Sequence, residues 1–402
     1  MKRKTCLVCL SDNISQIIQL GMHPFADSFI DKIRYGESEK VYPLNCMLCK
    51  DCGHVQTQYK TNPDDRYTDY EYSYTSSNSS FSKNHWVQFV EELFSKNIIN
   101  KKKSKVVEVG SNDGFIGQLL KDKNIDYLGV DASPFMASIA KKNNIETIVG
   151  LFGPKIINKI KNKIGDVDLL IANNVLNHAD NLIEFIESVK KTISPNGMFI
   201  FEVPYWLLDF QNNKFDKIYH EHVSYFTLRS LNKLLKNSKL YINKFEIVKY
   251  HGGSLRVFVT KEKKSELNNI NNSIKKEIET NVFKEKDYKN FMKIILNKRN
   301  NFLKEIYKIK SKGDKVVAIG AAARGNTILN FLNLDSSVID YVTDISPLKL
   351  NKYTPLTRIE IKKDSILSKY EKVYALSLTD NIPASLKNNL VKFNNNIKFL
   401  TL

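Results

Sequence analysis

The sequence predicts an α/β protein in which two Rossmann-like units follow a small cysteine-bearing domain. Three observations predict it: short β-branched runs alternate with helical stretches between residues 79 and 262, the alternation resumes after residue 313, and all five cysteines lie within the first 52 residues. Alternating strands and helices imply a parallel sheet covered by helices. The predicted domains are residues 1–78, residues 79–262 and residues 263–402, the last of which includes a helical linker.

Length and composition exclude several classes of protein. The 402 residues, 42% hydrophobic and 26% charged, are typical of a globular protein with two to three domains. The net charge of +18 is compatible with an acidic partner, but lysines scattered among asparagines favour solvated faces. No apolar run approaches the ~18 residues of a membrane span, and no signal-peptide core follows the basic N-terminus. We therefore expect a cytoplasmic protein that makes no membrane contact and keeps its thiols reduced.

The cysteines form two CxxC pairs. Each pair can supply two sulfurs from one tight turn, which suits a tetrahedral zinc site. The predicted zinc ligands are Cys6, Cys9, Cys49 and Cys52. Four thiolates leave no open coordination position, so this zinc is expected to stabilise the fold rather than catalyse. Cys46 and His54 remain open as substitute ligands.

In the middle domain, the expected strand at residues 106–109 runs into a glycine-bearing turn. Gly110 and Gly114 let the backbone approach a ligand at the start of the expected helix 115–120. Further strands are expected at residues 127–130, 167–171 and 198–202. Asp131 ends the second strand, where a carboxylate accepts hydrogen bonds from two ribose hydroxyls.

An acidic residue, Glu108, stands two positions before the first glycine and distinguishes this turn from a dinucleotide fingerprint. The turn resembles that of class I S-adenosylmethionine (SAM) methyltransferases, in which this acidic residue meets the cationic amino-acid end of the cofactor. SAM is therefore the expected cofactor, with NAD or no ligand as alternatives. The cofactor-binding candidates are Glu108, Gly110, Asn112, Gly114, Asp131 and Asn174. His178, in the same Asn-rich turn as Asn174, lies either at the pocket rim or in the core.

The C-terminal segment repeats the α/β texture. Residues 262–312 predict one or two linking helices, followed by strands at residues 316–319, 338–342 and 373–378 and a helix beginning at Thr327. A second glycine turn, residues 320–327, carries Arg324 and backbone N–H groups that suit a diphosphate, and Asp344 is placed to meet a ribose. The alternative is that this segment is a degenerate Rossmann-like half that packs against the rest of the protein and binds no ligand.

Tyr219-His220-Glu221-His222 combines groups suited to proton removal. A neutral histidine can deprotonate a C–H next to a ketone near pH 7, an adjacent glutamate can fix its tautomer, and a tyrosine hydroxyl can hydrogen-bond the enolate oxygen. A metal site and a structural polar cluster are the alternatives, although adjacent His-Glu-His is poor helical metal spacing. Residues 251–256 are predicted to form a site loop, because Arg256 offers a bidentate anion contact beside two glycines.

These segments together resemble the sugar C-methyltransferases that act on nucleotide-linked keto-deoxysugars. The matching stretches lie in order along nearly the whole chain: the two CxxC pairs, and residues 48–56, 108–114, 201–205, 218–226, 251–256 and 325–327. The resemblance implies a class I SAM methyltransferase domain between a small zinc-binding N-terminal domain and a Rossmann-like C-terminal domain. The middle and C-terminal domains together would enclose a nucleotide sugar.

The resemblance also implies roles for individual residues. His222 is the expected general base, assisted by Tyr219 and Glu221, and an N-terminal tyrosine, Tyr72 or else Tyr74, reaches the active site. The substrate-binding candidates are His178, His220, Arg256, Arg324 and Asn326. Arg324 replaces the lysine that usually precedes Gly-Asn-Thr, and the family's C-terminal Trp-Asn pair is missing, so the identity of the sugar and nucleotide stays open.

The function predicted from the sequence is SAM-dependent C-methylation of such a sugar by a monomer or weak homo-oligomer. The alternatives are a zinc-ribbon RNA methyltransferase and a non-enzymatic nucleic-acid binder, both of which suit the positive charge. The turn after the third strand reads Asn173-Asn174-Val175-Leu176 and lacks the Asn-Pro-Pro-Tyr type typical of base-amine methylation. A nucleic-acid binder would leave residues 219–222 unexplained, so nucleic acid is not the expected partner.

Overall fold

The computed structural model describes residues 1–62, 65, 75–77, 79–100, 104–263, 267–378 and 384–402. Within it the chain forms two compact units. The first unit comprises residues 1–16, 47–211 and 223–285, and the second comprises residues 17–46, 212–222 and 286–402. Neither unit is a single run of the chain, in contrast to the three consecutive domains expected from the sequence, whose boundaries stay a prediction.

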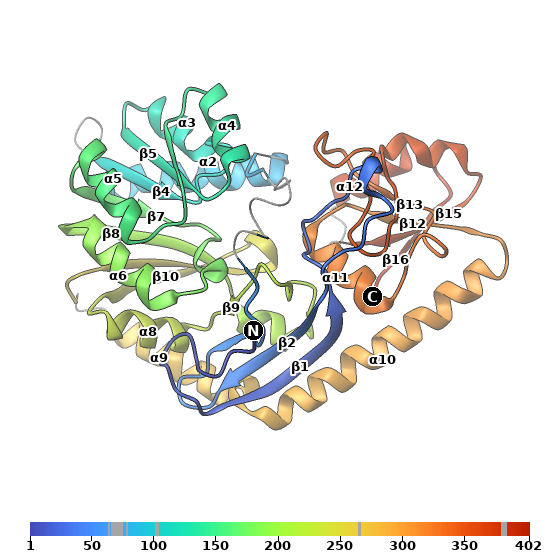
Figure 1. The fold of residues 1–402 in the computed structure, drawn as a ribbon, viewed down its shortest axis with the longest axis horizontal. Helices are drawn as coiled ribbons and strands as arrows, with labels where there is room; N and C mark the ends of the chain where they lie inside the picture. Colours follow the sequence, from blue (N-terminus) through green and yellow to red (C-terminus); the bar gives the residue numbers. More distant parts are fainter. Residues whose placement is uncertain (63–64, 66–74, 78, 101–103, 264–266, 379–383) are drawn as a thin grey trace. The chain divides into compact units, whose positions relative to one another are not determined.

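A seven-stranded sheet forms the centre of the first unit (Figure 1), with the order β10-β11-β8-β7-β4-β5-β6. Its strands are β4 (Lys105–Val109), β5 (Asp126–Asp131), β6 (Thr147–Val149), β7 (Val167–Ile171), β8 (Ile193–Pro204), β10 (Tyr241–Val248) and β11 (Ser254–Thr260). Strands β4 to β8 pair in parallel, and β11 runs antiparallel to both β8 and β10. This is the class I SAM methyltransferase fold, and the four strands predicted for residues 106–202 are confirmed.

The expectation of a loop through residues 251–256 is wrong in its second half. A short 3-10 turn, Tyr250–Gly252, is followed directly by β11, so Arg256 lies within a strand. The pair of glycines marks the turn that precedes this strand. The run Val257-Phe258-Val259 that follows is typical of a buried strand and is fully paired with β8.

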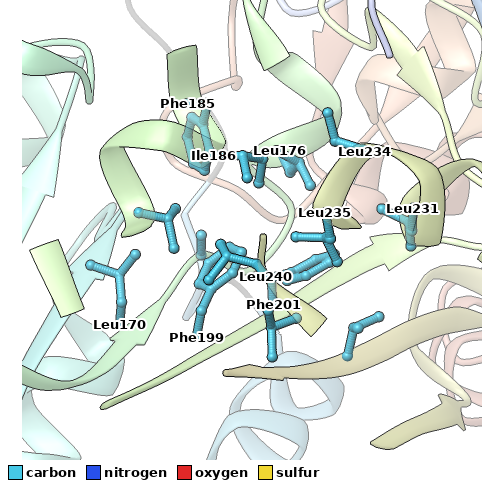
Figure 2. Close-up of a cluster of buried hydrophobic side chains, with 14 of the residues drawn as sticks. Leu170, Leu176, Phe185, Ile186, Phe199, Phe201, Leu231, Leu234, Leu235 and Leu240 are labelled. Carbon is cyan, nitrogen blue, oxygen red and sulfur yellow. The ribbon is translucent and has the colours of Figure 1, made fainter. Parts of the chain in front are cut away.

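Helices cover both faces of this sheet. On one face, α5 (Pro154–Ile164), α6 (Leu182–Thr192), α8 (Leu228–Asn237) and α9 (Leu267–Glu279) form a continuous core with inward side chains of β4, β7 and β8. Figure 2 shows Phe199 and Phe201 of β8 meeting leucines of α8 in this layer. Ile200, between them, packs on the opposite face with α2 (Ser80–Ser95), α3 (Phe115–Lys121) and α4 (Pro134–Lys142), as the two-residue strand period requires.

The N-terminal segment contains strands that were not expected from its sequence. A four-stranded sheet has the order β1-β2-β3-β9, with β1 (Ile14–His23), β2 (Tyr42–Cys49), β3 (Val55–Thr57) and β9 (Ser224–Tyr225). β3 begins three residues after the second CxxC pair and pairs antiparallel with β9, so that Gln56 faces Ser224. The boundary between the two units passes through β1 and β2 themselves.

A parallel sheet forms the centre of the second unit, as predicted, but it has five strands and not only the three expected. Its order is β14-β13-β12-β15-β16, with β12 (Lys315–Ile319), β13 (Tyr341–Thr343), β14 (Ile361–Lys362), β15 (Val373–Ser377) and β16 (Ile397–Leu400). The helices are α10 (Glu285–Lys310), α11 (Ala323–Leu332) and α12 (Ala384–Val391). Val338 and Ile339, expected in a strand, lie before β13 in buried irregular structure. The predicted linker is two helices, α9 in the first unit and α10 in the second.

None of the helices in the described parts of the chain combines the length and the hydropathy needed to cross a membrane.

Candidate functional site

The four cysteines of the CxxC pairs converge in the first unit. Each offers one sulfur, and the four sulfurs lie within 4.8 Å of one another. The Sγ atoms of Cys6 and Cys52 are 3.5 Å apart, and those of Cys9 and Cys49 are 3.6 Å apart. Tetrahedral zinc with Zn–S bonds of about 2.3 Å separates its sulfurs by about 3.8 Å. The spacing of the four sulfurs therefore fits a zinc ion.

His54 does not join the cysteine cluster, and neither does Cys46, among the residues that the structure describes. The Nε2 atom of His54 lies 3.2 Å from Ser224 Oγ on β9, and its ring packs on Phe226. The backbone carbonyl of His54 accepts the N–H of Cys49. His54 therefore links the second CxxC pair to β9.

Two positions in the first glycine turn accept only glycine. Gly110 has φ of +70°, and a Cβ atom there would lie 2.3 Å from Val175 Cγ2. Gly114, with φ of +80°, is the N-cap of α3, and its Cβ would lie 3.0 Å from Ile145. Both positive φ values favour glycine, and the missing side chains keep the backbone accessible to a ligand at the helix N-terminus.

The Asp131 carboxylate is oriented by two backbone N–H groups at the end of β5. Asn112 donates to its Oδ2 atom and Ser133 to its Oδ1 atom, both at 2.8 Å. Burial raises the pKa of Asp131, and these two hydrogen bonds oppose the rise. Each oxygen keeps a further lone pair, which is the geometry a ribose diol requires.

Glu108 is buried at the end of β4 among other carboxyl groups. It accepts a 2.5 Å hydrogen bond from Tyr127 Oη. Burial raises the pKa of Glu108 to about 8, and the nearby charges of Asp113 and Asp131 add to the rise. Three carboxyl groups around one turn favour a cationic ligand. These carboxyl groups therefore suit the sulfonium and ammonium groups of SAM.

Replacing Glu108 with glutamine is expected to stabilise the ligand-free protein while weakening SAM binding. The folded protein holds the Glu108 proton up to about pH 8, whereas the unfolded chain releases it near pH 4.5, so stability falls as pH rises between these values. At pH 8 the variant should gain about 2–4 kcal/mol over the wild type, and the gain should vanish near pH 4.5. Thermal melts at both pH values check this, and equal melting temperatures at pH 8 would contradict it.

Replacing Asp131 with alanine is expected to weaken SAM binding by roughly 1.5–3 kcal/mol, the range for lost hydrogen bonds to a charged group. Asp126→Ala, at the exposed start of the same strand, is the matched control and should bind SAM as the wild type does. Calorimetric titration with SAM measures both variants. An unchanged affinity of Asp131→Ala would show that the ribose is held elsewhere.

The turn after β7 brings Asn174 and His178 to the same edge of the sheet. Asn174 has φ of +56°, and its N–H donates to the carbonyl of Glu202. His178 is half-buried at the end of a 3-10 turn, Leu176–His178. The structure therefore brings all six cofactor candidates to the carboxyl ends of β4, β5 and β7, and their contacts with SAM stay a prediction.

The candidate base lies in the second unit. Tyr219 Oη is 2.6 Å from His222 Nε2, and His222 Nδ1 is 2.9 Å from the carbonyl of Lys217. A carbonyl only accepts, so Nδ1 carries the proton and Nε2 accepts the tyrosine O–H. Burial holds the pKa of Tyr219 well above its ordinary value, so its hydroxyl remains a donor.

The expectation that Glu221 fixes the histidine tautomer is wrong. Both ring nitrogens of His222 already have partners, and the tautomer follows from the Lys217 carbonyl. Glu221 Oε1 accepts the backbone N–H of Asp27 at 3.1 Å and so ties the segment 212–222 to the residues after β1.

The start of α11 holds the segment that carries the base. Thr327 Oγ1 donates to the carbonyl of Ile218, Asn326 Nδ2 donates to the carbonyl of Ala26, and Arg324 pairs with Asp216 at 3.5 Å. These contacts bring together two motifs that are more than 100 residues apart in sequence, residues 219–222 and 325–327. The sequence carried no local signal for this pairing.

The second glycine turn repeats the geometry of the first. The N–H of Gly320 donates to the carbonyl of Thr343, as that of Gly110 does to the strand before Asp131. Asp344 accepts the N–H groups of Ala321 and Ser346, both at 2.7 Å. The second unit therefore presents a carboxylate oriented in the same way as Asp131.

Arg256 and His220, like Arg324 and Asn326, have their side chains engaged within the protein. Arg256 donates from Nε to Glu202 and from Nη1 to Glu92, at 2.7 and 3.0 Å, and is 3% exposed. His220 Nε2 lies 3.2 Å from the carbonyl of Tyr42. These contacts favour packing roles, and substrate contacts of both residues stay predictions. Tyr72 and Tyr74 lie outside the described residues.

Three family models match consecutive parts of the chain. They are a zinc binding domain over residues 6–67, a methyltransferase domain over residues 80–243 and a C-methyltransferase C-terminal domain over residues 249–401. The zinc binding match contains all four converging cysteines, and the methyltransferase match contains every cofactor candidate. The last match contains the second glycine turn and α11.

The chain is similar to the C-methyltransferase NovU of Streptomyces niveus, at 26% identity over 358 residues, which is 89% of this chain and 84% of the relative. Among solved structures, it is similar to magnesium protoporphyrin IX methyltransferase of Synechocystis PCC 6803 with bound SAM, at 12% identity, 45% and 79% coverage of the two chains and a TM-score of 0.34. The PH0226 protein of Pyrococcus horikoshii matches at 19% identity, 47% and 95% coverage and a TM-score of 0.38.

Proposed function

We propose that this chain, which belongs to the SAM-dependent C-methyltransferase family and carries a structural zinc site, methylates a carbon atom of a nucleotide-linked keto-deoxysugar. Its activity as a SAM-dependent methyltransferase follows from the matched domains and the fold.

The observation that carries the proposal is the Tyr219–His222 pair. In the neutral imidazole, these hydrogen bonds place the proton on Nδ1, against the Lys217 carbonyl, and leave the lone pair of Nε2 toward Tyr219. C-methylation requires a carbon nucleophile, and a C–H next to a ketone becomes one when a base removes its proton. A neutral histidine with a fixed tautomer beside a permanent O–H donor supplies both groups that this step needs.

In the proposed mechanism, substrate binding turns the Tyr219 O–H from His222 Nε2 to the ketone oxygen. The lone pair of Nε2 then takes the proton from the adjacent carbon, and the C–H electrons form the enolate, whose oxygen Tyr219 stabilises. The Lys217 carbonyl stabilises the resulting imidazolium at Nδ1. SAM, which Glu108 and Asp131 would hold, would supply the methyl group to the enolate carbon, and its sulfur would keep the electrons of the carbon–sulfur bond.

The geometry of the second glycine turn supports a sugar substrate that is linked to a nucleotide. Asp344 is oriented by two backbone N–H groups as Asp131 is, which suits a second ribose. Arg324 lies at the start of α11, where a guanidinium and a helix N-terminus favour phosphate groups. Both residues share the second unit with His222.

Mass spectrometry of nucleotide keto-sugars incubated with SAM tests the substrate class. The expected result is a product heavier by one methylene group and stoichiometric S-adenosylhomocysteine. A salt-dependent gel shift with RNA, together with no methylated sugar, would instead favour the RNA methyltransferase alternative. The cytoplasmic location and the monomeric or weakly associated state stay predictions.

A further inference from the structure

Asp344 follows β13 in the second unit and is fixed by two backbone N–H groups. One oxygen of its carboxylate accepts the N–H of Ala321 in the second glycine turn, and the other accepts the N–H of Ser346, both at 2.7 Å. Each oxygen keeps a further lone pair, and the side chain is half-buried rather than enclosed. Two fixed oxygens with one free lone pair each match two adjacent hydroxyl groups.

The second glycine turn keeps its backbone open to a phosphate group. Gly320 has φ of +85°, as Gly110 has +70°, and alanines occupy the three positions that follow Gly320. Ala322 is the N-cap of α11, and an alanine side chain cannot accept the first N–H groups of the helix. These N–H groups therefore suit an anionic ligand at the positive end of a ten-residue helix.

A buried lysine adds a positive charge beside the same turn. Lys349 is 7% exposed, and its Nζ atom donates to the carbonyl of Ala321 at 2.6 Å. The ammonium also lies 5.0 Å from the centroid of the Phe29 ring. Burying a positive charge destabilises a protein unless an anion compensates it, so the field of Lys349 favours phosphate groups at the turn.

The residue directly after Asp344 is apolar and exposed. Ile345 is 70% exposed, whereas Ala132, directly after Asp131, is half-buried. A base joined to a ribose at Asp344 would extend past the carboxylate, and its flat face would cover an apolar side chain there. The second unit therefore offers a surface for each of the three parts of a nucleotide.

We propose that the second unit selects ribonucleoside diphosphates over 2′-deoxyribonucleoside diphosphates, with Asp344 accepting hydrogen bonds from the 2′- and 3′-hydroxyl groups. The inference rests on the proposed function and narrows it, because the sugar substrate would be linked to a ribonucleotide. A deoxyribose lacks one of the two hydroxyl groups and leaves one carboxylate oxygen without its ligand partner. Asp344 is then the residue that determines the class of nucleotide.

Calorimetric titration of the full-length wild type with matched ribo- and 2′-deoxyribonucleoside diphosphates of four bases, dTDP included, tests this selection. Saturating S-adenosylhomocysteine keeps these probes from the cofactor candidates of the first unit. For the base that binds best, we expect the 2′-deoxy and 3′-deoxy analogues each to bind at least about 10-fold more weakly. This is the lower end of the effect of one hydrogen bond to a charged group, and it suits a half-buried carboxylate.

Three variants assign the selection to Asp344. Asp344→Ala should bind the ribo and deoxy forms with similar affinity, because the carboxylate that distinguishes them is gone. Ile345→Ser should weaken both forms equally and keep their ratio. Asp335→Ala is the control: Asp335 is exposed before β13 and accepts the N–H of Ser337, so this variant should bind both forms as the wild type does.

The outcomes separate the inference from the function on which it rests. Equal binding of the ribo and deoxy forms by the wild type, or tightest binding of dTDP, overturns the selection and leaves methylation of a nucleotide-linked sugar standing. A folded Asp344→Ala protein that keeps the wild-type ratio also overturns it. If the wild type binds none of these nucleoside diphosphates, the nucleotide part of the proposed function is wrong, and this inference with it.

Discussion

Replacing His222 with alanine is expected to lower methyl transfer by about 10²–10⁴-fold, the usual cost of losing a general base. The imidazole is the group whose lone pair the hydrogen bonds of Tyr219 and Lys217 orient, and the substitution removes that lone pair from beside the tyrosine hydroxyl. The residues proposed to bind SAM lie in the first unit, so SAM affinity should not change. Steady-state kinetics and a calorimetric SAM titration measure the two effects separately.

His220→Ala tests whether the base is assigned to the right histidine. His220 packs between Phe25 and Tyr42, so its loss should act through packing and lower the melting temperature. Loss of turnover in a stably folded His220→Ala protein, with turnover kept in His222→Ala, would move the base to His220. If neither change affects turnover, the enolate mechanism is wrong for this chain.

Replacing Cys49 with serine is expected to abolish zinc binding and most soluble protein. Structural zinc contributes apparent binding free energies of about 10–16 kcal/mol at pH 7, which exceeds the stability of a typical domain. The second CxxC pair is followed by β3, which pairs with β9. Loss of the zinc is therefore also expected to weaken the pairing of these two strands in the N-terminal sheet. Emission spectrometry of the purified protein should give one zinc per chain for the wild type.

Cys46→Ser is the control for this experiment, because Cys46 is buried on β2 outside the cluster of four sulfurs. It should keep a full complement of zinc. Full zinc content in a Cys6/Cys52 double variant would contradict the assignment of the ligands.

The strands and glycine turns of both units could be predicted because their signals are local. A β-branched run followed by glycine and a helical pattern, as at Val106–Gly110, specifies strand, turn and helix within about ten residues. In the N-terminal sheet, β3 and β9 were missed because they have only three and two residues and pair across more than 160 positions. No pattern of period two can show itself in strands so short.

The candidate site was predictable where residue type carries the chemistry. The four cysteines and the acidic, glycine-rich turn were identified by spacing. The tautomer of His222 depends on a backbone carbonyl, that of Lys217, which has no sequence signature.

Proton exchange in deuterated water tests the central claim, base-catalysed enolate formation, most directly. The wild type is incubated with S-adenosylhomocysteine, which cannot donate a methyl group, and a nucleotide-linked 4-keto-deoxysugar that it methylates in the presence of SAM. The account predicts deuterium at the carbon next to the ketone, detected by NMR, and none with His222→Ala. Exchange that proceeds equally in both proteins would contradict base-catalysed enolate formation. So would methyl transfer to an oxygen or nitrogen atom of the sugar substrate.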